Sequence, residues 1–262
     1  MPNTIEVDAL FGRIEAFSDD LITDQIVSFG AHTRPELAFF LSVVEAGDAV
    51  FDIGGHIGTF AIPIAQKVGT AGRVLVVEGS LANFGVLSRN VSRLALSQIV
   101  YPIYAVIGLS TERYTLQSVN RNTGASFFLP TQDSDGTVAA CLDDLLQAHF
   151  VPRVVKMDIE GLEVAALQEA SKLLVSLPIL YLEVSDQQLR RCDASLAELS
   201  NMLVALGYRF FRNVGDRNGA HDDYVVRELA DLSLGGTFFD VLAVHSNDPR
   251  IQGVIAEATL GT

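Results

Sequence analysis

The chain has 262 residues, of which 49% are apolar, so it is long enough for one large α/β domain or two small ones. Its formal net charge is -14, and a field of that sign repels phosphate backbones and anionic membrane surfaces, which argues against nucleic acid and lipid partners. Cys141 and Cys192 lie far apart without a C-x-x-C motif and the N-terminus lacks the apolar core of a secretory signal, so we expect a cytoplasmic protein without disulfides.

Strand-type and helix-type runs alternate from about residue 35 onward. This alternation predicts one Rossmann-like α/β domain over residues 35–245, with helices on both faces of a mostly parallel, seven-stranded sheet. The predicted strands are 49–53, 73–78, 99–107, 154–158, 179–184, 208–212 and 238–244. The predicted helices are 35–45, 57–68, 81–94, 142–147, 163–174 and 195–206. Pro102 cannot donate a ladder hydrogen bond, so we expect its strand at an edge of the sheet or with an irregularity.

Three segments have weaker patterns. Residues 1–34 are interpreted as an N-terminal decoration, residues 246–262 as a C-terminal tail, and residues from about 113 to 140 as a small antiparallel β insertion. Because irregular segments carry much of the specificity of enzymes, substrate contacts are expected from residues 1–34, from 120–136 and from the 213–224 loop.

A glycine-rich turn follows the first predicted strand, where Asp52 precedes Gly54, Gly55 and Gly58. Glycine lets a backbone approach a ligand closely, and the helix that follows offers unpaired N–H groups. The dinucleotide motif G-x-G-x-x-G is not completed in either register. The spacing acid-x-Gly-x-x-x-Gly instead favours S-adenosylmethionine, whose ammonium Asp52 can face directly or through water.

The next predicted strand ends at Glu78, followed by Gly79 and Ser80. A carboxylate at this place can accept hydrogen bonds from both ribose hydroxyls of a nucleotide-type ligand, because neighbouring strands end at the same sheet edge. Glu78 therefore supports either an adenosylmethionine or a dinucleotide site.

Further acids follow two other predicted strands. Asp158 and Glu160 come after the strand that begins at Val154, and Glu183 lies near the end of the strand that begins at Ile179. Ligands of open α/β sheets bind at the carboxyl ends of the strands, so we expect these acids to converge on one site.

The chain resembles the FkbM family of class I methyltransferases over about residues 48–212. The motifs that carry the resemblance are FDIGGHIGTF, VVEGS, NTGASF, CLDDLL, VVKMDIEGLEVAAL and LYLEVSD, in that order. The resemblance implies the class I methyltransferase fold with an antiparallel last strand, S-adenosylmethionine as cofactor, and O-methylation of sugar or polyketide hydroxyls, hence a role in natural product or polysaccharide biosynthesis. This chain has Gly55-His56 where the family usually has Ala-Asn, and Glu78-Gly79 where it usually has Glu-Pro.

Methyl transfer to an alcohol is assisted by a group that takes the hydroxyl proton. Asp158 is the first candidate for this catalytic role, followed by Glu160, Glu183 and His56. The expected cofactor-binding residues are Asp52, Gly54, Gly55, His56, Gly58, Glu78, Gly79, Ser80, Ala105 and Asp158. Ala105 is included because the end of the third strand usually lies beside adenine in this fold. No metal is expected, since the acids show no contiguous ligand spacing.

The other histidines show no metal-ligand spacing and are interpreted as surface or core side chains; they are His32, His149, His221 and His245. Two alternative functions stay open: a nicotinamide-dependent oxidoreductase on the same fold, and a non-catalytic module. A small molecule or a sugar is the expected substrate. The positive mean hydropathy makes a homodimer possible.

Overall fold

The centre of the molecule is a twisted sheet of eight strands. The structure is a computed structural model that describes residues 3–260, with side chains through residue 256. The strands lie in the spatial order β12 (Val226–Leu229), β11 (Tyr208–Asn213), β13 (Phe238–His245), β10 (Ile179–Ser185), β9 (Val154–Met157), β3 (Ala49–Ile53), β4 (Arg73–Glu78) and β5 (Val100–Tyr104). Strands β10, β9, β3, β4 and β5 run parallel, whereas β13 is antiparallel to both of its neighbours.

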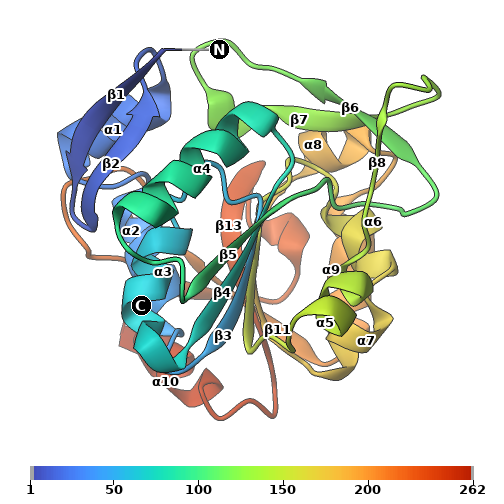
Figure 1. Cartoon of the computed structure of the whole chain (residues 1–262). Helices are drawn as coiled ribbons and strands as arrows, with labels where there is room; N and C mark the ends of the chain where they lie inside the picture. The colour runs from blue at the N-terminus through green and yellow to red at the C-terminus, as the bar shows by residue number, and fades with distance from the viewer. Residues whose placement is uncertain (1–2, 261–262) are drawn as a thin grey trace.

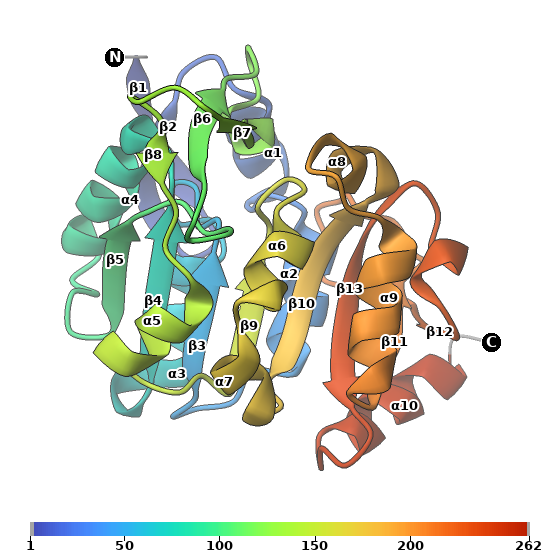
Figure 2. The ribbon, with the colours of Figure 1, turned by 90° about the vertical axis from the view of Figure 1, so that its right-hand side faces the viewer.

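Helices cover both faces of this sheet, as Figure 1 shows with the sheet seen nearly edge-on. Figure 2, turned by 90°, shows the strands of the sheet side by side. The alternation of β4 explains the two layers, because Val74 and Val76 belong to one core cluster and Leu75 and Val77 to the other. The first cluster is closed by α2 (Arg34–Ser42), α3 (Ala61–Val68), α4 (Leu81–Arg93) and α10 (Ile251–Leu260). The second is closed by α5 (Leu142–Ala148), α6 (Glu163–Gln168), α7 (Ser171–Val175), α8 (Asp186–Arg191) and α9 (Leu196–Ala205).

Two small sheets lie at the carboxyl ends of the parallel strands (Figure 1). The N-terminal segment forms a hairpin, β1 (Thr4–Ala9) and β2 (Gly12–Phe17), followed by α1 (Leu21–Phe29). The insertion forms an antiparallel sheet in the order β7 (Phe127–Thr131), β6 (Arg113–Gln117) and β8 (Thr137–Val138). Both segments are therefore placed beside the edge where the sequence predicts the site.

The predicted fold class is confirmed, but several elements differ from the prediction. The sheet has an eighth strand, β12, because residues after the 213–224 loop return to pair with β11. The helix predicted from residue 57 begins only at Ala61, since Gly58 adopts a φ of 97° that no right-handed helix accommodates. The helix predicted over 163–174 is two helices, and the Asp143 carboxylate accepts from Lys172 N and Leu173 N at the start of the second.

Strand β5 with Pro102 forms an edge of the sheet, as predicted. Among the described residues, no helix combines the length and the apolar character that crossing a bilayer requires.

Candidate active site

A cavity of about 560 Å³ lies at the carboxyl ends of β3, β4, β9 and β10. Its walls include ten residues that the sequence predicts for the site: Gly54, Gly55, His56, Glu78, Gly79, Ser80, Ala105, Asp158, Glu160 and Glu183. All three segments expected to contact substrate contribute to it, for example through His32, Thr123 and Arg217. Asp52 and Gly58, also predicted as cofactor-binding residues, are not among the residues that line this cavity.

The glycines of the loop are required by the protein's own packing. Gly54 has a φ of 84°, and a Cβ atom there would lie 1.8 Å from the carbonyl oxygen of Asp158. A Cβ atom on Gly55 would lie 2.1 Å from Val76 Cγ1. The sequence predicts a close approach to a ligand, whereas at these two positions the backbone approaches Asp158, directly after β9, and Val76 of β4.

Three residues with side chains adopt left-handed backbone conformations in the cavity wall. The φ angles are 40° for Thr33, 51° for His56 and 57° for Glu160. Such conformations cost on the order of 1 kcal/mol or more for residues other than glycine, and they cluster at functional sites. At these three positions a strained backbone carries a residue of the cavity wall.

Asp52 and Lys156 form a buried ion pair. Asp52 is a predicted site residue, whereas Lys156 is not. Parallel pairing of β3 and β9 sets the two residues in register, and Lys156 Nζ lies 3.4 Å from both Asp52 Oδ1 and Asp158 Oδ2. Lys156 Nζ also donates to the carbonyl oxygen of Gly54 at 3.4 Å. Burial lowers the pKa of Lys156, but the two carboxylates outweigh this effect and raise it, so the ammonium stays charged.

Glu78 fixes the turn between its own strand and the glycine loop. Its Oε2 accepts from His56 N at 2.8 Å and its Oε1 from Ser80 N at 2.7 Å. Burial raises the pKa of Glu78 to about 7, although these two N–H groups lower it. A carboxylate has about four acceptor positions, so Glu78 keeps lone pairs for a ligand in the cavity.

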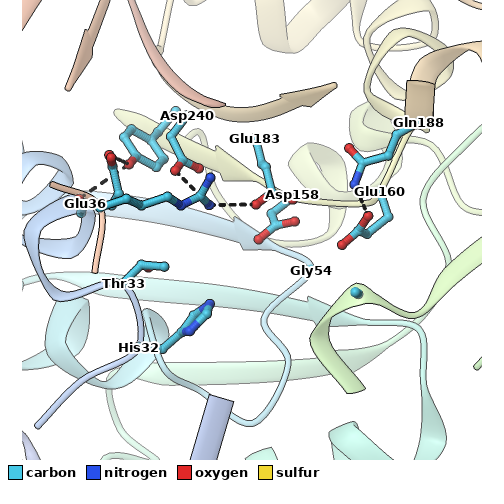
Figure 3. A network of polar contacts seen from close by, with 12 residues as sticks. His32, Thr33, Glu36, Gly54, Asp158, Glu160, Glu183, Gln188 and Asp240 are labelled. Carbon is cyan, nitrogen blue, oxygen red and sulfur yellow. Dashed lines mark hydrogen bonds and ion pairs between the residues drawn. The ribbon is translucent and has the colours of Figure 1, made fainter. Parts of the chain in front are cut away.

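A network of acids lies on the other side of the cavity, and Figure 3 shows Asp158, Glu183 and Asp240 in it. Arg217 Nη2 lies 2.9 Å from Glu183 Oε1 and 3.0 Å from Asp240 Oδ2. Side-chain oxygens of Asp158, Glu160 and Glu183 lie within 4.8 Å of one another.

Burial, and next the charge of Asp158, raise the pKa of Glu160 to about 8 and that of Glu183 well above its usual range. Burial also acts to raise the pKa of Asp158, but Lys156 outweighs it and the pKa is lowered. At neutral pH, Asp158 is therefore the ionised member of this group.

The N-terminal segment and the insertion meet above the glycine loop. The hydroxyl of Thr123 donates to Asp20 Oδ2 at 2.8 Å, and Thr123 N donates to the same oxygen at 2.6 Å. His56 Nε2 lies 2.8 Å from Thr123 Oγ1. We refer to this contact between Asp20, Thr123 and His56 as the roof of the cavity.

Lys156 and Arg217 were missed because neither lies in a motif whose chemistry requires a cation. One usable signal for Lys156 is its position inside the apolar run of β9, because a lysine in a fully buried strand needs a carboxylate partner. No signal in the sequence identifies Arg217, which lies in an irregular loop.

The raised carboxyl pKa values make the free energy of unfolding depend on pH. Burial raises the pKa to about 7 for Glu36, Glu78 and Glu163 and to about 8 for Glu160. Because the native protein then binds more protons than the unfolded chain, stability falls as pH rises through these values. His32 and His56, whose pKa values burial lowers to about 3 and about 4, act in the opposite direction only below about pH 6.5.

We therefore expect the free energy of unfolding to decrease by a few kcal/mol, roughly 1 per group, between about pH 6.5 and pH 8. Urea denaturation at the two pH values measures this change. Glu163→Gln keeps an oxygen for Ile159 N and Gly161 N, so it should remove its share of the pH dependence. Equal or higher stability of the wild type at pH 8 would contradict the prediction.

The cavity fits S-adenosylmethionine on three grounds. Its volume lies in the range of about 300–1,000 Å³ that is usual for small-molecule sites. Its lining carries the carboxyl group of Glu78 and the ionised Asp158 beside the cations of Lys156 and Arg217, which suits a ligand that has ribose hydroxyls, an ammonium and a carboxylate. Among the described residues, the buried His56 Nδ1 has no hydrogen-bond partner.

The strand order, the glycine loop after β3 and the acid that ends β4 define a class I S-adenosylmethionine-dependent methyltransferase. The chain belongs to the FkbM methyltransferase family, because the family model described as methyltransferase FkbM domain matches residues 52–210. S-adenosylmethionine is its cofactor. Membership of this family favours a methyltransferase over the alternative of a nicotinamide-dependent oxidoreductase.

Solved structures of other methyltransferases are similar to this chain. A precorrin-6y C5,15-methyltransferase from Geobacter metallireducens has 13% identity and a TM-score of 0.47, with 82% of this chain and 88% of that chain covered. A SAM-dependent methyltransferase from Aquifex aeolicus has 14% identity and a TM-score of 0.47, with 86% and 94% covered. An O-methyltransferase from Bacillus cereus, in complex with SAH, has 13% identity and a TM-score of 0.45, with 87% and 83% covered. No curated protein matches the chain at a significant level.

Proposed function

We propose that the protein transfers the methyl group of S-adenosylmethionine to a hydroxyl of a sugar, glycoconjugate or polyketide-type small molecule. The observation that carries the proposal is the cluster of Asp158, Glu160 and Glu183, whose oxygens lie within 4.8 Å of one another in the cavity wall. Closely spaced carboxyl groups are suited to binding several hydroxyls of one polyol. The net charge of -14 supports a small-molecule acceptor over nucleic acid or a lipid surface, and the homodimer stays a prediction.

We propose that Gly54, Gly55, Gly79, Ser80 and Ala105 hold the cofactor with their backbones, beside Glu78 and His56. We propose that Asp52 and Gly58 stabilise the conformation of the loop without contacting the cofactor. The bound cofactor supplies an electrophilic methyl group on a sulfonium, and the protein's task is to hold a hydroxyl oxygen in line with it.

The acids differ in the role that they can take towards the acceptor. Glu160 and Glu183, with raised pKa values caused first by burial, keep a proton at neutral pH and can donate hydrogen bonds to acceptor oxygens. The ionised Asp158 is engaged by Lys156 at 3.4 Å. We therefore propose Asp158 as a positioning residue that accepts a hydrogen bond from the acceptor and stabilises positive charge nearby.

The test is incubation of the purified protein with methyl-labelled S-adenosylmethionine and a panel of methyl hexosides, nucleotide sugars and macrolide aglycones. We expect label in an alkali-stable methyl ether, and a fall of about 100-fold for Asp158→Asn with binding of S-adenosylhomocysteine retained. Label on nitrogen or carbon would overturn the O-methyl assignment. Cofactor binding without transfer to any member of the panel would favour the non-catalytic module.

A further inference from the structure

His32 lies in the cavity wall, outside the segment that the family model matches. It belongs to the short connection between α1 and α2, and the sequence analysis interpreted it as a surface or core side chain. Figure 3 shows its ring directed towards Asp158, below Glu183. The charged and titratable groups that act on it are His56, Arg217, Asp158 and Lys156. It therefore faces the side of the cavity that we assign to the acceptor.

The hydrogen bonds around His32 determine which ring nitrogen carries the proton. Thr33 N can only donate, and it lies 3.2 Å from Gln25 Oε1, so the Gln25 atom at this position is the oxygen. His32 Nδ1 lies 2.7 Å from the same oxygen and must donate to it. In a neutral imidazole the other nitrogen then has no proton. Within residues 3–260, no hydrogen bond is made by His32 Nε2, so its lone pair is free for a ligand.

His56 has a similar tautomer but a less accessible lone pair. The Thr123 hydroxyl donates to Asp20, so His56 Nε2 must donate to Thr123 and Nδ1 is the acceptor. That Nδ1 atom is buried from solvent, whereas His32 is only half-buried. Of the two rings, His32 is the one that can reach an incoming acceptor.

We propose that His32 Nε2 is the proton acceptor for the hydroxyl that becomes methylated, and that Gln25 is the positioning residue that fixes its tautomer. This inference rests on the proposed O-methylation. As the hydroxyl oxygen bonds to the methyl carbon, the carbon–sulfur bonding pair stays with sulfur and the hydroxyl proton moves to Nε2. The ring later returns this proton to water. The Asp158 carboxylate stabilises the imidazolium that forms, in keeping with its positioning role.

Burial, and next His56 and Arg217, lower the pKa of His32 to about 3, so the ring is neutral across the physiological range. The tautomer can therefore be read without any acceptor. Long-range proton–nitrogen correlation spectra of nitrogen-15-histidine protein, free of ligands, are expected to show His32 Nδ1 protonated and Nε2 unprotonated between about pH 5.5 and 8. His32→Gln assigns the signals by their loss. Gln25→Leu should give a mixture of tautomers, while His149→Gln, an exposed site, should leave the His32 signals in place.

With an acceptor that the wild type methylates, His32→Gln is expected to lower kcat by about 100-fold or more and to change KM by less than about threefold. Binding of S-adenosylhomocysteine by calorimetry should be unchanged in this variant. A protonated Nε2 in the wild type, or wild-type turnover in His32→Gln, would overturn the assignment to His32. Absence of methyl transfer by the wild type would instead count against the proposed function, and the tautomer measurement separates the two failures.

Discussion

Replacing Lys156 by methionine is expected to lower the free energy of unfolding by about 3–5 kcal/mol. The substitution keeps much of the side-chain volume but removes the cation that lies 3.4 Å from Asp52, which is fully buried. Among the described residues, neither Asp52 oxygen has a hydrogen-bond partner, so the carboxylate depends on this lysine for compensation. Removing one member of a buried pair leaves an unpaired charge, which is far more costly than the pair itself.

Urea denaturation at pH 7 measures this effect, with Lys67→Met on the exposed face of α3 as the matched control. The control should change the free energy of unfolding by less than about 0.5 kcal/mol. Lys156→Met combined with Asp52→Asn removes both charges and should recover part of the loss. A loss below about 1 kcal/mol for Lys156→Met alone would show that the pair does not hold the loop.

Replacing Glu78 by alanine is expected to weaken binding of S-adenosylhomocysteine by about 100-fold or more. Hydrogen bonds to a charged group contribute about 1.5–3 kcal/mol each, and every 1.4 kcal/mol corresponds to about tenfold in affinity. Alanine also releases His56 N and Ser80 N, which Glu78 holds at 2.8 Å and 2.7 Å, so the loop loses its preorganisation. Titration calorimetry on the purified variant provides the measurement.

Two further variants separate these contributions. Glu78→Gln keeps one oxygen for a backbone donor and should bind with intermediate affinity. Glu198→Gln, on the exposed face of α9, removes a carboxylate remote from the cavity and should bind as the wild type does. Unchanged affinity in Glu78→Ala would remove Glu78 from the cofactor site.

The parallel strands could be predicted because apolar runs between turn residues are local signals. The bounds of β4 match the prediction, and the Pro102 strand lies at the edge. The predicted start of α3 was wrong because Gly58 adopts a left-handed conformation. The break between α6 and α7 was not predicted because it depends on Asp143, a residue of α5 that caps α7. Strand β12 was missed because its pairing follows a long irregular loop.

The site was predictable where chemistry and topology coincide in a motif. Glu78 and Asp158 follow strands, so their meeting at one sheet edge follows from the fold. Lys156 lies inside the motif VVKMDIEGLEVAAL, but its role in the site was not predicted. His32 and Arg217 lie in irregular segments, and only the folded chain brings them to the cavity.

The left-handed conformations of Thr33, His56 and Glu160 have a consequence for engineering. Glycine at any of these positions would relieve backbone strain of about 1 kcal/mol or more, but it would add an unfolded-state entropy cost of about 0.5–1 kcal/mol, so stability would change little. The same change would delete a functional group from the cavity wall. Thermostable variants of this enzyme should therefore be sought in the outer helices, with these three positions held constant.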